Sequence, residues 1–289
     1  MNGIIVIDKP AGWTSMDVCA KLRGVLHEKR IGHSGTLDPM ATGVLPVFVG
    51  RATRAVEFAE SADKRYVAHM RCGLITDTQD TTGNVLETRD CDLTEEDIRA
   101  ILPAFTGEID QIPPMYSAIK VGGKKLYELA RRGETVARQP RRVTIKHIAL
   151  LGQENGDFIL DVTCSKGTYI RSLVADMGEY LSCGAAMAAL RRTAAGAFTL
   201  DDAHTLDEVI AASDAGNLSG ILRPVDSLFG SYPALTLNAV QERRCRNGKE
   251  FKASVADGRF RVYAEGGEFL ALCEAENGTV RTVKSFFDV

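Results

Sequence analysis

The sequence predicts an α+β fold with a mixed or largely antiparallel central sheet, followed by a small β-rich module. Predicted strands precede, separate and follow the helices without the strand–helix alternation of a parallel sheet. After residue 230 the pattern changes to short alternating strands separated by Asp-Gly, Gly-Gly and Asn-Gly pairs, which indicate hairpins. We therefore expect one domain over 1–230 and a second over 231–289.

The N-terminal segment predicts a strand, a tight turn and a helix. Residues 4–7 form an apolar run of strand length, and a Lys-Pro-Ala-Gly turn follows it. Thr14 or Ser15 can cap the next helix, because apolar residues then recur at helical spacing up to Leu26. Residues 30–43 are too rich in Gly, Ser, Thr and Pro for regular structure.

Alternating apolar residues predict the next strands. Residues 44–49 form one of them, and Pro46 indicates that it lies at an edge or contains a bulge. Residues 66–72 form another, and the turn-forming residues 81–84 predict a hairpin that leads to a strand at 85–87.

The rest of the chain is predicted to contain both helices and strands. Thr94 followed by Asp97 has the form of a capping box, so a helix is expected to begin there. Two prolines and two glycines predict a loop at 112–125. The remaining predicted elements are strands at 143–151 and 158–164, helices at 170–181 and 185–192, and strands at 260–264, 269–274 and 280–286.

Composition is typical of a globular protein with a sizeable core. Apolar residues make up 45% and charged residues 25% of the 289 residues. No apolar run approaches the roughly 20 residues that span a bilayer, and the apolar run at 4–7 is too short for a signal-peptide core. The seven cysteines are scattered, odd in number and never in a CxxC pair, which argues against a zinc ribbon or a secreted disulfide framework. We expect a cytoplasmic protein with no membrane partner.

No sequence motif indicates a metal or a cofactor. The five histidines form no ligand-spaced cluster, and neither HExxH nor a glycine-rich phosphate loop occurs. Residues 76–80 superficially suggest a phosphotransfer aspartate or a calcium loop, but they lack the calcium loop's glycine and terminal glutamate. We interpret them as structural and expect neither metal nor cofactor.

Charge is distributed unevenly along the chain. Residues 120–146 hold nine Lys and Arg against two Glu, whereas 76–110 hold ten acidic residues against two Arg. Such a layout lets one face attract a polyanion while the net charge stays at −3. On composition alone, an RNA-binding surface and a merely solvated basic face are equally good interpretations.

A glycine-rich segment at 32–43 contains Asp38 followed by proline. Asp-Pro favours a turn, and the flanking glycines allow backbone shapes that other residues avoid. A carboxylate can attack an electrophilic carbon covalently. From the local pattern alone, however, a surface loop with an acid at its bend is the favoured interpretation.

The whole segment resembles the signature loop of the TruB family of tRNA pseudouridine synthases, which implies the pseudouridine synthase fold. Other motifs of that family match in the same order over residues 3 to about 227. They are KPAGWTS at 9–15, PPMYSAIK at 113–120 with Gly123 and LYELAR at 126–131, SKGTYIRSL at 165–173, and LRRT at 190–193. The C-terminal segment resembles a PUA-type RNA-binding domain more loosely, and a β-rich stability cap is its alternative interpretation.

The resemblance implies three catalytic residues. Asp38 corresponds to the nucleophile, and Arg171 to its charge partner, which would lower the carboxyl pKa and keep the group ionised. Tyr66 corresponds to the aromatic residue that packs on the flipped base and is a candidate proton acceptor. The sequence leaves open whether the carboxylate first attacks the sugar or the base.

Further residues are implied to bind the substrate. His33 corresponds to the residue that takes the target base's place in the RNA stack, Tyr169 to a second active-site tyrosine and Leu190 to an apolar wall. Lys120 begins the basic stretch up to residue 146, in an RNA-binding insertion expected at about 110–146, which would follow the tRNA phosphates around the T arm.

The resemblance thus implies an isomerase that converts uridine 55 in the T loop of tRNA to pseudouridine, as a monomer and without a guide RNA. The alternative from another class is a non-catalytic protein that binds or folds tRNA through the same basic surface. A guide-RNA-dependent relative that acts on ribosomal RNA is disfavoured, because the chain is short and has no long basic tails.

Overall fold

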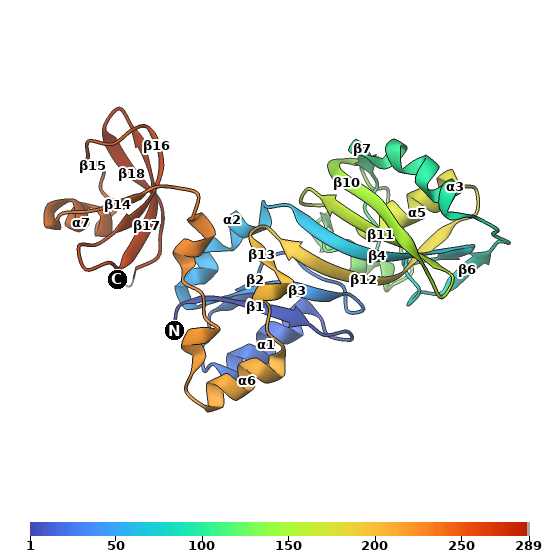
Figure 1. The fold of residues 1–289 in the computed structure, drawn as a ribbon, viewed down its shortest axis with the longest axis horizontal. Coiled ribbons are helices and arrows are strands. Elements are labelled where there is room, and N and C mark those ends of the chain that lie inside the picture. Colours follow the sequence, from blue (N-terminus) through green and yellow to red (C-terminus); the bar gives the residue numbers. More distant parts are fainter. Residues whose placement is uncertain (288–289) are drawn as a thin grey trace.

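The computed structural model describes residues 1–287. Its two large sheets are separate, and the smaller of them lies at one end of an elongated molecule (Figure 1). The predicted α+β class is confirmed. Residues 288–289 of the expected second domain lie outside the described part of the chain. No helix within residues 1–287 is both long and apolar enough to cross a membrane.

The main sheet has nine strands in the order β1-β3-β12-β4-β11-β10-β7, with β2 beside β3 and β13 beside β12. Its pairings are antiparallel except that of β3 with β12, so the sheet is mixed and largely antiparallel. Its strands are β1 (Gly3–Lys9), β2 (Ile31–His33), β3 (Thr42–Val49), β4 (Lys64–Cys72), β7 (Gly107–Gln111), β10 (Arg141–Glu154), β11 (Asp157–Cys164), β12 (Ala185–Ala195) and β13 (Phe198–Thr199).

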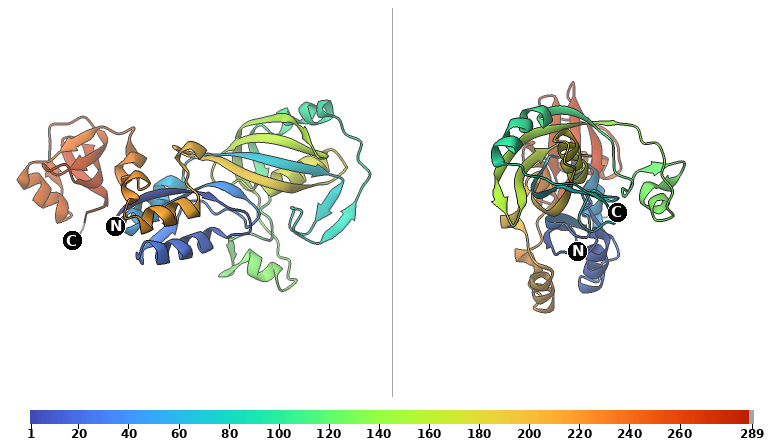
Figure 2. Two further views of the ribbon diagram at one scale, coloured as in Figure 1. Left: turned by 60° about the horizontal axis from the view of Figure 1, so that its bottom comes forward. Right: turned by 90° about the vertical axis from the view of Figure 1, so that its right-hand side faces the viewer.

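The β1–β3 end of this sheet is covered on both faces. Ile5 and Ile7 pack with the helices α1 (Ser15–Val25) and α6 (Leu206–Asp214), which lie side by side in Figure 2. Ile4 and Val6 pack on the other face with residues 52–59 and with the second sheet. Burial on both faces explains why β1 is continuously apolar instead of alternating.

The other end of the sheet forms the largest core. The helices α3 (Glu95–Ile101) and α5 (Ile170–Tyr180) pack there against β4, β10, β11 and β12. Thr94 caps α3 with a capping box, as predicted, and Thr14 does the same for α1. The short helical segments that link these elements are α2 (Val56–Glu60) and the 3₁₀ turns Gly50–Ala55, Leu102–Phe105, Leu200–Asp202, Leu218–Gly220 and Val225–Phe229.

The smaller sheet has the order β14-β16-β17-β18-β15 and forms a half-barrel with the helix α7 (Ala239–Arg246) beside it (Figure 1). It packs on the main domain through Leu272 and Phe286, which join the core around Phe229. Its strands are β14 (Ala234–Thr236), β15 (Phe251–Lys252), β16 (Gly258–Tyr263), β17 (Phe269–Glu276) and β18 (Thr279–Ser285).

Two small hairpins extend from the main sheet. One pairs β5 (Leu74–Thr76) with β6 (Val85–Thr88). The other pairs β8 (Lys120–Val121) with β9 (Lys124–Lys125) and continues into α4 (Leu126–Ala130). Both views in Figure 2 show this second segment standing away from the body of the molecule.

The structure corrects the helix predicted at 185–192, which is the strand β12. The segment is rich in alanine and therefore has high helix propensity. It nevertheless lies between β4 and β3 in the middle of the sheet, with Ala186 and Met187 fully buried. Tertiary packing outweighs local propensity here.

Three other predictions differ in detail. Pro46 lies in an interior strand, in the gap between the part of β3 that pairs with β12 and the part that pairs with β2, where its missing N–H is tolerated. The turn at 81–84 joins β5 to β6, because Gly73 ends the long strand before the hairpin begins. The predicted loops at 30–43 and 112–125 contain the short strands β2, β8 and β9.

Candidate active site

Asp38 lies in the loop between β2 and β3, and this loop is anchored to the start of α1. The Ser15 hydroxyl accepts a hydrogen bond from the Leu37 amide (2.9 Å) and donates one to the Leu37 carbonyl (3.3 Å). The Gly12 amide donates to the carbonyl of Pro39 (2.8 Å). Ser15 therefore holds the loop, while Thr14 caps the helix. These bonds fix the backbone on both sides of the carboxylate.

Arg171 is buried on α5 and pairs with Asp38. Its Nε lies 2.9 Å from Asp38 Oδ2, and its Nη2 donates to Asp38 Oδ1 at 3.3 Å. The other guanidinium contacts are to the carbonyl oxygens of Thr78 (2.9 Å) and Tyr116 (2.8 Å). The Arg171 side chain is 5% exposed and that of Asp38 is 36% exposed, so only the carboxylate can be approached from solvent.

Asp80 is a second carboxylate beside the same guanidinium, at 3.8 Å from Nε. It is buried and accepts hydrogen bonds from the Thr82 amide and from the hydroxyls of Thr78 and Thr82. The sequence interpretation of residues 76–80 as merely structural missed this contact. A Thr/Asp-rich turn is common, and nothing local indicates that it packs on an arginine almost a hundred positions away.

The pKa of Asp38 is raised above its ordinary value. Burial is the largest cause, the charge of Arg171 opposes it, and Asp80 adds to it. The expected lowering by Arg171 is therefore present, but burial outweighs it in the free protein. The carboxylate is held in a site where ionisation is unfavourable without its partner.

Tyr66 and Leu190 form the apolar side of this group. They come from the adjacent strands β4 and β12, each is 8% exposed, and both belong to the core that includes Leu37. Burial raises the pKa of the Tyr66 phenol, while the charge of Arg192 opposes the rise. The phenol is therefore protonated near neutral pH in the free protein.

Tyr169 directly precedes α5 and is the second tyrosine of this group. The side-chain amide of Gln111 clamps its backbone, since it donates to the Tyr169 carbonyl (3.0 Å) and accepts from the Tyr169 amide (2.8 Å). Burial raises the pKa of the Tyr169 phenol, and the charge of Asp38 raises the pKa values of both Tyr66 and Tyr169. The three side chains thus share one electrostatic environment.

His33 and Lys120 lie further out. His33 ends β2, and its Nδ1 is buried with no hydrogen-bond partner among the described residues. Burial and the charge of Arg192 lower the His33 pKa, so the ring is neutral near pH 7. Lys120 is exposed on β8, and within residues 1–287 no hydrogen bond or ion pair joins it to the Asp38 group.

Two buried cations complete the site, and the sequence analysis gave neither a role. Lys9 is fully buried and donates to the carbonyls of Pro10, Trp13 and Pro39. Burial lowers the pKa of Lys9 to about 8, against the opposing charge of Asp38. Arg192, also fully buried, donates to the carbonyls of Val44 and Gly35. Charged residues are seldom buried, so their type gave no signal.

The fold is similar to that of chains in two solved complexes. The chain in "Structure of H/ACA RNP bound to a substrate RNA containing 2'-deoxyuridine" superposes with a TM-score of 0.75 at 25% identity, covering 99% of this chain and 85% of the other. A chain of "Crystal Structure of a Cbf5-Nop10-Gar1 Complex" gives 0.75 at 27% identity, with coverages of 99% and 85%.

Curated relatives are more similar in sequence. Proteins called tRNA pseudouridine synthase B are 43% identical in Burkholderia mallei (97% of this chain, 95% of the relative) and 44% identical in Thiobacillus denitrificans (96% and 93%). The protein of the same name from Clostridium kluyveri is 40% identical, over 99% of this chain and 100% of its own.

Family models cover most of the main domain. "TruB family pseudouridylate synthase (N terminal domain)" matches residues 23–170, and "tRNA pseudouridylate synthase B C-terminal domain" matches 171–230. Together with the fold and the pairing of Asp38 with the buried Arg171, these matches define an isomerase of the pseudouridylate synthase class. Within that class, the chain belongs to the TruB family.

Proposed function

We propose that this chain isomerises uridine 55 in the T loop of tRNA to pseudouridine, with Asp38 as the covalent nucleophile. The observation that carries the proposal is the carboxylate of Asp38, approachable from solvent and paired with the buried Arg171. The near-full-length relatives named tRNA pseudouridine synthase B support the substrate.

The target base must leave the RNA stack before Asp38 can reach it. Extrusion costs a few kcal/mol of stacking and pairing, and stacking on an aromatic side chain returns about 1–3 kcal/mol per base. In our proposal His33 fills the vacated place, which suits its neutral ring. Tyr66, Tyr169 and Leu190 receive the flipped uracil.

The chemistry follows from this placement. Asp38 attacks an electrophilic carbon of the uridine. The N-glycosidic bond breaks, the uracil rotates, and a bond from its carbon 5 to the sugar forms. The covalent bond to Asp38 breaks, which regenerates the carboxylate, and the carbon-5 proton leaves to a base. Arg171 orients the carboxylate with two contacts and favours its ionised form. Tyr66 is the proposed proton acceptor. Its phenol must first lose its own proton, which the charge of Arg192 favours and burial opposes.

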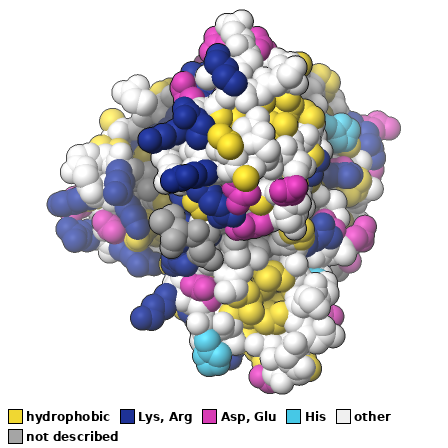
Figure 3. All heavy atoms as spheres, turned by 90° about the vertical axis from the view of Figure 1, so that its left-hand side faces the viewer, with side chains coloured by type: hydrophobic (Ala, Val, Ile, Leu, Met, Phe, Trp, Pro, Cys, Tyr) yellow, Lys and Arg dark blue, Asp and Glu magenta, His cyan; other side chains and the backbone are white. Residues whose placement is uncertain are grey.

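Two surfaces would bind the rest of the tRNA. We assign residues 1–230 to the catalytic domain, with an RNA-binding insertion at about 110–146, and 231–289 to a PUA-like RNA-binding domain. The last turn of α7 holds Arg243, Arg244 and Arg246. Figure 3, which views the molecule from this end, shows Lys and Arg side chains gathered on one half of the face.

We further propose that the chain acts as a cytoplasmic monomer without a guide RNA or cofactor. Its 40–44% identity to the relatives named tRNA pseudouridine synthase B covers 93–100% of their lengths. Its identity to the chains from the H/ACA complexes is lower, at 25–27% over 85% of their lengths. These similarities favour a protein that acts on tRNA without a guide RNA.

Release of tritium from carbon 5 of uridine tests the proposal. Unmodified tRNA labelled at that position is incubated with the wild type, Asp38→Ala and Asp214→Asn, a matched control at an exposed acid near the end of α6. We expect release by the wild type and the control only, while all three bind tRNA. Release by Asp38→Ala at the wild-type rate would refute the assignment. Binding without release by the wild type would support the non-catalytic alternative.

A further inference from the structure

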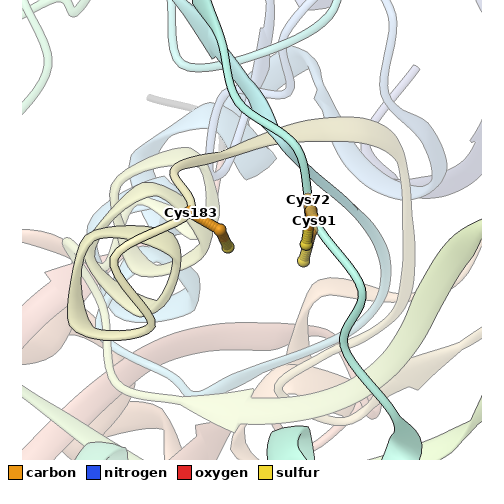
Figure 4. Close-up of side chains that lie close together, drawn as sticks. All are labelled: Cys72, Cys91 and Cys183. Carbon is orange, nitrogen blue, oxygen red and sulfur yellow. The ribbon is translucent and has the colours of Figure 1, made fainter.

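Three cysteines that are far apart in the sequence lie together at the end of β4. The Sγ atoms of Cys72, Cys91 and Cys183 are all within 4.8 Å of one another. Figure 4 shows Cys183 on one side and Cys72 and Cys91, which overlap in this view, on the other. Cys72 ends β4, Cys91 follows β6, and Cys183 lies in the loop between α5 and β12.

The backbone holds the three segments in place. The Gly73 amide donates to the Gly184 carbonyl at 3.0 Å, and the Arg89 amide donates to the Gly73 carbonyl at 2.9 Å. Gly73 has φ +77°, and a Cβ there would lie 2.6 Å from the Arg89 carbonyl oxygen and 3.3 Å from Cys91 Cβ. Only glycine permits this close approach. The fold itself therefore positions the thiols.

We propose that Cys72, Cys91 and Cys183 bind one thiophilic d¹⁰ metal ion, with Zn²⁺ as the probe. Thiolates are the ligands that select zinc and Cu(I). With Zn–S bonds of about 2.3 Å, sulfur atoms around a tetrahedral zinc are about 3.8 Å apart. Sulfur atoms already within 4.8 Å need only small side-chain adjustments.

A metal ion suits this cluster better than a disulfide. A disulfide joins two sulfur atoms and leaves the third thiol unused, whereas one ion binds all three. Among the described residues no fourth Cys, His, Asp or Glu joins the group, so water completes a tetrahedral site. Cys183 is buried and the other two are half-buried, which leaves a path for the ion and the water.

The metal would tie the β5–β6 hairpin to the end of α5. That hairpin carries Thr78 and Asp80, and α5 carries Arg171, which contacts both. The ligands were missed in the sequence because they lie 19 and 92 positions apart, while zinc motifs are recognised from local pairs. The site therefore fixes two segments that meet at the Asp38 group.

Zinc titration of the reduced, metal-free full chain tests the proposal. A chromophoric chelator competes for Zn²⁺, and Co²⁺ is used separately to detect thiolate-to-metal charge-transfer absorption. We expect one ion per wild-type chain and a higher melting temperature with zinc. Removing a residue that only hydrogen-bonds to a metal ligand costs about 10–100-fold in metal affinity. Cys91→Ser and Cys183→Ser each remove a ligand itself, so each should lose at least about 100-fold.

Cys245→Ser is the matched control, because Cys245 of α7 contacts Cys273 of β17 and, among the described residues, no third ligand joins this pair. It should bind zinc like the wild type. Zinc should also protect Cys72, Cys91 and Cys183 from alkylation, as peptide mass spectrometry reports. Tritium release and circular dichroism check that the variants fold. Wild-type affinity in Cys91→Ser, or a wild type that forms a disulfide but binds no zinc, would overturn the proposal.

Discussion

Asp38 and Asp80 share one nitrogen of Arg171, whose Nε lies 2.9 Å from Asp38 Oδ2 and 3.8 Å from Asp80 Oδ2. Two carboxylates thus compete for one buried cation. Asp80 is also held by three hydrogen bonds from Thr78 and Thr82, whereas Asp38 has an exposed face. The acidity of Asp38 therefore depends on Asp80, a residue that is itself buried.

Asp80→Asn should lower the pKa of Asp38. The charge of Asp80 raises that pKa, so a neutral amide removes a repulsion while it can still accept bonds from Thr82. In the proposed mechanism Asp38 acts as a carboxylate, so activity should be lost as pH falls through its pKa. The acid limb of kcat/KM should therefore move to lower pH in the variant. A limb that stays in place or moves upward would show that Asp80 does not act on Asp38 by charge.

Arg171→Met should have the opposite effect on the same limb. The guanidinium lowers the pKa of Asp38 against burial. Its removal takes away the cation that the two carboxylates share, so that pKa rises further. We expect the acid limb at higher pH and kcat reduced by about 100-fold or more. Arg171→Lys retains the positive charge but loses the planar guanidinium and its set of N–H donors. The acid limb of its pH profile should therefore stay closer to that of the wild type. Rates across pH in single-turnover assays distinguish the two variants.

Lys9 should make the free energy of unfolding depend on pH in the alkaline range. Its pKa is about 8 in the folded chain and 10.5 in the reference state, so the unfolded chain binds more protons between these values. Its contribution to stability therefore rises as pH increases from 8 to 10.5, by about 1–3 kcal/mol. Lys9→Met removes the titration of Lys9 and leaves the titrations of all other groups in place.

Urea unfolding of the wild type and Lys9→Met at both ends of this range measures the effect. The difference in free energy, wild type minus variant, should grow with pH. A constant difference would mean that Lys9 is as easily protonated in the folded chain as in the unfolded one.

The sequence predicted most elements correctly, and the reasons for the failures are physical. Capping boxes at Thr14 and Thr94 are local interactions, so the sequence reveals them directly. The strand β12 was misjudged because its neighbours in the sheet, β3 and β4, decide its conformation. Local propensity carries no information about such neighbours.

The residues of the candidate site likewise divide into those that the sequence predicted and those that it could not predict. Asp38, Tyr66, Leu190, Tyr169 and Arg171 were predicted only through resemblance to a family, and the structure brings them into one environment. The roles of Asp80, Lys9 and Arg192 could not be predicted, because each depends on contacts with distant backbone or charges. The cysteine group depends on three segments meeting, which no local spacing encodes.

Unpaired cations of the insertion should dominate the salt dependence of tRNA binding. Lys120 and Lys124 are exposed on the β8–β9 hairpin, and among the described side chains no acid pairs with either. Each phosphate contact contributes a slope of about −0.9 to log K against log salt. Lys120→Ala with Lys124→Ala should therefore weaken binding and flatten the slope by up to about two units.

Arg142→Ala is the control for this change, because Asp110 and Glu108 already compensate the charge of Arg142. Its slope should stay close to that of the wild type. Filter binding at several salt concentrations gives all three slopes. An unchanged slope in the double variant would place the RNA surface elsewhere.

Gly43→Ala should destabilise the chain far more than an alanine at another left-handed glycine. Gly43 is the second residue of β3, just after the Asp38 loop. It pairs with Arg192 of β12 and has φ +98°. A Cβ there would lie 2.2 Å from the Arg192 carbonyl oxygen, so the parallel pairing must open. We expect a loss of about 3 kcal/mol or more in the free energy of unfolding. Gly122→Ala, at φ +58° with open space around its Cβ position, should lose only about 1–2 kcal/mol. Urea unfolding of both variants measures the difference, and equal losses would show that left-handed strain alone, without the contact to Arg192, accounts for the glycine at position 43.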